Sequence, residues 1–172
     1  MAYLRCTKKL LKQIGLDAAV RAREDGSIET DDDWYAYLTW LEGRKCVLFT
    51  NVGTLYPFMV LDARKAQLRE LPKLFLAEYE QNLNHLGATT SQIAHELSVM
   101  RDVKIGKSRN QKILGSMNDY AFQAEVCVDA SGGVKQADRL LVSERLGEAP
   151  MGVIGYSSGI RELRKKLEAH AT

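Results

Sequence analysis

The chain has 172 residues, which is enough for one substantial hydrophobic core. Apolar residues make up 45% of the sequence and charged residues 27%, which is typical of a soluble globular protein. The net charge of +2 is too small to indicate bulk binding to nucleic acid or to a membrane surface. Any such function must therefore depend on where the charges lie.

The cysteines and histidines exclude a disulfide framework and a zinc site. Cys6, Cys46 and Cys127 are odd in number and far apart, which indicates reduced thiols. The three histidines show no ligand spacing with them. The first residues contain no apolar signal core, and no apolar run is long enough to span a membrane. We therefore expect a cytoplasmic protein with no metal, no cofactor and no membrane partner, folded as a single domain over residues 1–172.

The first sixty residues predict a small β-sheet. Residues 2–6 resemble a short strand, and Thr7 can cap a helix that ends at Gly15. Residues 16–33 are polar and contain glycine, which predicts a mobile loop. Pro57 indicates an edge strand or a bulge. Strand-like runs separated by turns predict an antiparallel meander over 34–41, 45–50 and 54–61.

The rest of the chain has mainly helical spacing. Thr89 or Thr90 can cap one helix, and Ser157 or Ser158 the last one. An extended piece is expected over 99–105. The predicted helices span about 72–87, 89–97, 108–128 and 134–146, with a final one after 158. The fold class is therefore α+β, with a small antiparallel β-sheet in the N-terminal half packed against a mainly helical C-terminal half.

Two basic segments each precede a predicted helix and could bind an anion or a partner. Free backbone N–H groups at a helix start favour a bound anion. If the strand 2–6 pairs beside the extended piece 99–105, both segments lie at one edge of the sheet. The alternative is that these cations only solubilise the surface. The first segment contains Arg5, Thr7, Lys8 and Lys9, and the second contains Lys107, Arg109 and Lys112, with Ser108 and Gln111 forming a capping box.

The helix predicted over 108–128 has a polar stripe that contains Lys112, Ser116 and Asp119. The stripe could present a cation, a hydroxyl and a carboxylate to a cleft, or it could be an ordinary solvated face. Asn118 lies at the boundary of the stripe, where an asparagine is more often a buried structural group than a catalytic one.

Other chemical sites have little support in the sequence. Gly106-Lys-Ser108 resembles part of a phosphate-binding P-loop, but Arg101 stands where that motif needs its first glycine. No histidine lies in a motif with Cys6, Cys46 or Ser116. The run Asp31–Asp33 could supply paired carboxylates, although such a run usually stays solvated. The aromatic run 34–41 could stack on single-stranded nucleic acid, but rings of this kind more often pack in a core.

Three motifs together resemble a family of small bacterial and phage-encoded proteins known only as a domain of unknown function. The likeness covers most of the chain, and its last motif is the most specific. It implies one compact domain in a cytoplasmic, mobile-element setting, and it supplies no reaction, cofactor or catalytic residue. The motifs are Arg5-Cys-Thr-Lys-Lys-Leu-Leu11, then Trp34-Tyr35 followed by Arg44-Lys-Cys-Val-Leu-Phe-Thr-Asn51, then Arg109 with Leu114-Gly-Ser-Met-Asn-Asp119.

Three hypotheses follow. The first is a non-enzymatic binding module that contacts protein or nucleic acid in a mobile-element or phage-conflict setting. The second is a small enzyme acting on a phosphate-containing substrate, in which Arg5, Lys8 and Arg109 hold the anion while Ser116 or Asp119 works on the reacting group. The third is purely structural. In it, Arg109, Ser116, Asn118 and Asp119 form a buried hydrogen-bond network, and Asn118→Ala costs about 1–3 kcal/mol.

Overall fold

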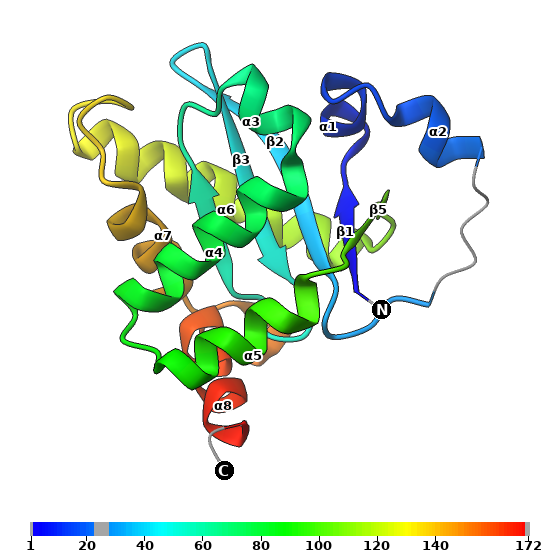
Figure 1. The fold of residues 1–172 in the computed structure, drawn as a ribbon. Coiled ribbons are helices and arrows are strands. Elements are labelled where there is room, and N and C mark those ends of the chain that lie inside the picture. The colour runs from blue at the N-terminus through cyan, green and yellow to red at the C-terminus, as the bar shows by residue number, and fades with distance from the viewer. Residues whose placement is uncertain (1, 23–27, 171–172) are drawn as a thin grey trace.

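A five-stranded mixed sheet in the order β4-β3-β2-β1-β5 forms the centre of the fold (Figure 1). The computed structural model describes residues 2–22 and 28–170. The strands are β1 (Tyr3–Cys6), β2 (Trp34–Leu41), β3 (Arg44–Asn51), β4 (Pro57–Val60) and β5 (Lys104–Lys107). Strands β2, β3 and β4 form the predicted antiparallel meander, and Pro57 begins an edge strand as expected.

The sheet is not wholly antiparallel, because β1 runs parallel to both β2 and β5. A parallel pair needs a crossover connection of a dozen or more residues. The chain between Cys6 and Trp34 is long enough for one and carries two short helices. The antiparallel expectation therefore holds for three strands and is wrong for the two that lie at the basic segments.

The hairpin between β2 and β3 shows how local sequence fixes the register. Leu41 pairs with Arg44, so the connecting loop has only two residues. These are Glu42 and Gly43, with φ of 53° and 73°. Two-residue hairpin loops favour positive φ at both positions because that twist matches the twist of the strands. The predicted turn is confirmed.

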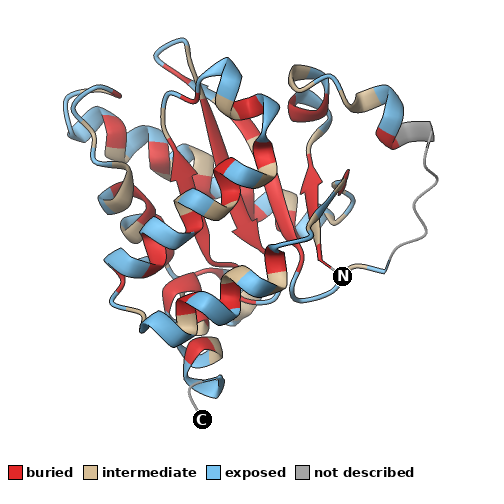
Figure 2. Cartoon of the chain, in the orientation of Figure 1, coloured by how far each residue is buried: buried red, intermediate tan, exposed pale blue. Residues whose placement is uncertain are grey.

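Helices cover both faces of the sheet, and Figure 2 shows that their outer sides are exposed while the strands are largely buried. Alternate strand residues point to opposite faces. Trp34 and Phe49 face α1, α4, α5 and α8, whereas Leu48 and Met59 face α6 and α7. The α+β class is confirmed. The helices are α1 (Lys8–Gln13), α2 (Asp17–Ala22), α3 (Lys65–Arg69), α4 (Leu71–His85), α5 (Thr90–Met100), α6 (Gln111–Ala130), α7 (Arg139–Glu148), the 3-10 turn η1 (Gly152–Ile154) and α8 (Gly159–Ala169).

The aromatic run serves mainly as core. The ring of Trp34 lies 5.4 Å from Phe58, 5.0 Å from Phe75 and 4.7 Å from Tyr79 between centroids, in edge-on contacts. Edge-to-face contacts of this kind add to the stabilisation from burial. Trp34 is buried, so it is not available for stacking on nucleic acid. The core-packing interpretation is confirmed for this residue.

Several sequence-based boundaries are wrong, including the start of the helix expected over 134–146, which begins at Arg139. Within the predicted loop 16–33, the segment Asp17–Ala22 is helical because its alanines favour a helix, and 23–27 lies outside the described residues. Val99 and Met100 belong to α5, so the extended piece begins only at β5. Thr89 is the residue that caps α5, because its side chain accepts from the backbone N–H of Gln92.

Candidate functional site

The pairing of β1 with β5 brings the two basic segments to one edge of the sheet. Cys6 lies opposite Lys107 in the parallel register. The backbone N–H of Ser108 donates to the carbonyl oxygen of Cys6 at 3.1 Å, which ties the ends of the two strands together. The conditional expectation that the first strand pairs beside the extended piece is therefore confirmed. Ligands of sheet proteins commonly bind just beyond the carboxyl ends of parallel strands.

A cavity of about 330 Å³ lies at this edge, between α1, α2 and the end of β5. Lys8 and Lys107 are exposed, and their positive charges come to the cavity from different elements. Leu11 and Val20 are buried and give it an apolar wall. The lining residues are Lys8, Leu11, Asp17, Val20, Lys107 and Ser108. The cavity thus combines two cations, a hydroxyl, a carboxylate and apolar surface.

Thr7 and the helix that follows it contribute less than the sequence suggests. Thr7 occupies the N-cap position of α1, but its side chain makes no capping hydrogen bond. Helix α1 has only six residues, so we assign no anion site to its first turn. The second residue after the cap, Lys9, is exposed and is not part of the cavity wall.

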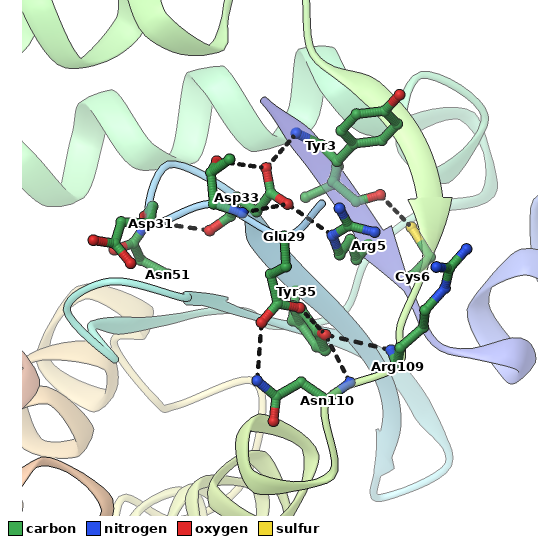
Figure 3. A network of polar contacts seen from close by, with 12 residues as sticks. Tyr3, Arg5, Cys6, Glu29, Asp31, Asp33, Tyr35, Asn51, Arg109 and Asn110 are labelled. Atoms are coloured by element: carbon green, nitrogen blue, oxygen red, sulfur yellow. Dashed lines mark hydrogen bonds and ion pairs between the residues drawn. The ribbon is translucent and has the colours of Figure 1, made fainter. Parts of the chain in front are cut away.

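Arg5 is buried and serves to hold the chain together (Figure 3). Its Nε donates to Oδ2 of Asp33 at 2.7 Å, and the aspartate is also fully buried. Oδ1 of Asp33 accepts from the backbone N–H of Tyr3 at 3.0 Å and from the hydroxyl of Thr30 at 3.2 Å. This ion pair fixes the residues before β2 against β1. Arg5 does not line the cavity.

A second group of hydrogen bonds holds the segment that carries Arg109 (Figure 3). The hydroxyl of Tyr35 accepts from the backbone N–H groups of Arg109 at 3.3 Å and Asn110 at 2.9 Å, and it donates to the Glu29 carboxylate. Nδ2 of Asn110 donates to the same carboxylate at 2.9 Å. Burial is the main cause that raises the pKa of Tyr35, followed by the hydrogen bond to Glu29. The phenol therefore stays protonated and keeps donating at neutral pH.

Asn110, not Ser108, caps the central helix. Its Oδ1 accepts from the backbone N–H of Lys112 at 3.0 Å and of Ile113 at 3.4 Å. Ser108 is instead held by its backbone hydrogen bond to Cys6. The predicted capping box is wrong because the sheet holds Ser108 two residues before the N-cap.

The polar positions of α6 do not gather at one point. Lys112 and Asp119 are exposed, and the buried Ser116 donates from Oγ to the carbonyl oxygen of Lys112 at 3.1 Å. Asn118 is exposed and accepts from the hydroxyl of Tyr37 at 2.9 Å. Because Arg109 is exposed too, the hypothesis of a buried network among Arg109, Ser116, Asn118 and Asp119 is wrong.

Several residues of the polar network were not recognised from the sequence. Asp33 was read only as part of a solvated acidic run, yet it is buried. Asn51 is the last residue of β3 and is also buried. Its side chain donates to the carbonyl oxygens of Asp31 and Asp33 at 3.1 and 3.2 Å and accepts from Thr54. In the sequence, only their positions distinguish Asp33 and Asn51: Asp33 directly precedes β2, and Asn51 ends β3.

Among the residues that the structure describes, neither the thiol of Cys6 nor any group of metal-binding side chains forms a separate site. Burial raises the pKa of the Cys6 thiol, which keeps it protonated and weakens it as a nucleophile. Within residues 2–22 and 28–170, no three His, Cys, Asp or Glu side chains are grouped so that they could hold a metal ion. None of the helices described is long and apolar enough to cross a membrane.

Comparison with known proteins places the chain in a family. A family model described as a domain of unknown function (DUF6933) matches residues 3–162, so the chain belongs to that family. The resemblance inferred from the sequence is confirmed. A comparison with curated proteins found no match.

Proposed function

We propose that this member of the DUF6933 family is a non-enzymatic binding module that contacts nucleic acid, in the mobile-element or phage setting that the sequence suggests. The observation that carries the proposal is the convergence of two basic segments at the carboxyl ends of β1 and β5. The two segments are close in space although about one hundred residues separate them in the chain. Folding therefore brings positive charges together at one edge, although the net charge of the whole chain is only +2.

The cationic residues at this edge are exposed to solvent. Lys8 and Lys9 are exposed at the start of α1, and Lys104, Lys107 and Arg109 are exposed along and after β5. Phosphate groups are the usual partners of such exposed Lys and Arg side chains, and they supply most of the affinity for nucleic acid. The edge is therefore suited to a partner that carries many phosphates.

Nucleic acid is favoured over a protein partner because the described basic segments, residues 2–14 and 101–112, carry no large apolar side chain of high exposure. Protein interfaces usually have aromatic or apolar residues at their centre, whereas nucleic-acid interfaces are polar and positively charged. The large apolar side chains with high exposure include Ile28, Phe122 on α6 and Tyr156 before α8. No such side chain belongs to residues 2–14 or 101–112.

Binding is favoured over catalysis because the residues of the enzyme hypothesis do not assemble. Arg5 is buried in its pair with Asp33, and Ser116 donates to its own helix backbone. Asp119 is on the exposed side of α6, two turns after the helix start. A substrate at the cationic edge would therefore have no assembled reacting group from this set.

The proposal is tested by titrating labelled single-stranded RNA and duplex DNA with the protein and following fluorescence anisotropy at several salt concentrations. Binding should weaken linearly in log salt because neutralised phosphates release counterions. Replacing Lys8, Lys9, Lys107 and Arg109 with alanine should abolish binding at moderate salt. On single strands the salt slope should fall by about 3, because each contact contributes about 0.7.

A matched control removes four exposed cations elsewhere: Lys65, Arg69, Lys135 and Arg161. It changes the net charge by the same amount and should leave most of the binding intact. The proposal is wrong if the native protein binds neither nucleic acid at low salt. It is also wrong if the two quadruple variants lose affinity equally, because binding would then follow net charge and not the edge.

A further inference from the structure

We propose that the cavity beside β1 and β5 is a site for one terminal phosphate monoester together with the nucleoside that carries it. This inference rests on the proposed function and narrows it to the end of a strand or a free mononucleotide. The shared chemistry of both sources is a phosphomonoester on a sugar with an attached base.

The lining of the cavity has a net positive charge, because its two lysines outweigh the one carboxylate of Asp17. Lys8 and Lys107 both line the cavity although they belong to α1 and β5. A phosphate monoester carries about −1.5 to −2 charges at pH 7, whereas each internal phosphate of a strand carries only one. The net positive charge of the lining therefore attracts a terminal phosphate more strongly than an internal one. Ser108 adds a hydroxyl that can donate to a phosphate oxygen.

The size and the other walls of the cavity fit a single nucleotide. Its volume of about 330 Å³ is near the lower end of small-molecule sites, which span roughly 300–1,000 Å³. Leu11 and Val20 provide apolar surface against which a base or sugar can pack. Helices α1 and α2 and the end of β5 each contribute residues to the wall of the cavity.

Asp17 limits how much negative charge the cavity accepts. Asp17 is one of the lining residues, and its negative charge opposes the additional negative charge of a diphosphate or triphosphate. The chain also lacks the glycine-rich loop that holds the phosphate chain of a triphosphate. These features select one phosphate.

The test compares single-stranded RNAs of one sequence that end in a 5′-phosphate, a 5′-hydroxyl or a 3′-phosphate, each labelled at the other end. The native protein should bind one of the phosphorylated ends roughly tenfold more tightly than the unphosphorylated strand, the gain expected from charge-assisted hydrogen bonds. A nucleoside monophosphate added as competitor should remove this preference, whereas the same concentration of inorganic phosphate should remove less of it. Stronger competition by the mononucleotide than by the strand end would identify the free nucleotide as the source.

Two double variants of equal charge separate the cavity from the surface around it. Lys8→Ala with Lys107→Ala removes both cavity lysines, and Lys9→Ala with Lys104→Ala removes two exposed neighbours that do not line it. Only the first pair should abolish the preference for a terminal phosphate, while both should reduce the salt slope. Equal unfolding midpoints for the two variants confirm that both fold.

The outcomes distinguish the two proposals. Salt-dependent binding without any preference for a phosphorylated end, or a preference lost equally in both variants, would overturn the cavity site and leave nucleic-acid binding intact. Absence of binding to both RNA and duplex DNA would overturn the proposed function. The cavity would then be tested alone by titrating a nucleoside monophosphate, and no binding, or binding that survives Lys8→Ala with Lys107→Ala, would overturn it too.

The pH dependence gives an independent check. The second ionisation of a phosphate monoester has a pKa of about 6, so the ligand loses one negative charge as pH falls through that value. The preference for the phosphorylated end should therefore be full above pH 7 and decline toward pH 5. The unphosphorylated strand has no such group and serves as the reference at each pH. An unchanged preference at pH 5 would contradict binding of the dianion.

Discussion

Arg5 and Lys8 are only three residues apart and carry the same charge, yet the fold gives them opposite surroundings. Arg5 points from β1 into a buried ion pair with Asp33, whereas Lys8 begins α1 at the surface and lines the cavity. The polar network around Arg5 and Tyr35 thus holds β1 and the start of α6 in place, and these elements carry the exposed cations. We call this network the support of the cationic edge. The comparison teaches that charge in a sequence does not identify a binding residue until burial and partners are known.

The two regions should respond to mutation in opposite ways. Changes in the buried network should lower the free energy of unfolding, and changes at the cationic edge should lower affinity with little effect on folding. Surface substitutions usually stay within about 0.5 kcal/mol in stability, whereas breaking a buried ion pair costs about 3–5 kcal/mol.

The largest expected effect is that of Asp33→Ala. The substitution removes the carboxylate from a buried guanidinium and also removes the acceptor of the Tyr3 backbone N–H. We expect the free energy of unfolding in urea to fall by about 3–5 kcal/mol. Asp31→Ala is the matched control, because the side chain of Asp31 is exposed, and it should change stability by less than about 0.5 kcal/mol. Equal effects of the two variants would mean that the buried pair is not a support.

A sharper test of the support is Tyr35→Phe, which removes one oxygen. The backbone N–H groups of Arg109 and Asn110 and the carboxylate of Glu29 would all lose a partner. We expect a loss of about 1–3 kcal/mol in the free energy of unfolding, as for other unsatisfied buried polar groups. Because the segment that carries Arg109 would be held less firmly, affinity for nucleic acid should also fall.

The control for this variant is Tyr37→Phe. The hydroxyl of Tyr37 donates only to the exposed Asn118 among the hydrogen bonds described. Its removal should cost less than about 0.5 kcal/mol and leave affinity unchanged. If Tyr35→Phe were equally mild, the hydroxyl would not be what holds the start of α6.

The sequence predicted the α+β class, the meander and the two basic segments because these depend on local pattern and on residues close in the chain. It did not predict the parallel pairing of β1 and β2, since that depends on how residues 7–33 cross over the sheet. The pairing of β1 with β5 could be stated only as a condition. Asp33 could not be separated from its neighbours in the acidic run, because only its contact with Arg5 on another strand distinguishes it.

The same limit explains the case of Asn118. Helical periodicity places this residue at the boundary between two faces, which favoured a buried role, but the angle at which α6 packs decides whether a boundary residue is covered. The structure leaves Asn118 exposed, with a single hydrogen bond from Tyr37. A position of this kind belongs with the surface and not with the buried network.

The smallest expected effect is accordingly that of Asn118→Ala. A sequence-based expectation of a buried group gave a cost of about 1–3 kcal/mol, whereas one exposed hydrogen bond should contribute less than about 0.5 kcal/mol. Urea unfolding of Asn118→Ala beside Tyr37→Phe measures this, and the double variant should cost no more than either alone if the two side chains interact only with each other. A loss above 1 kcal/mol would mean that Asn118 stabilises the fold as the buried network does. The network would then extend to the middle of α6.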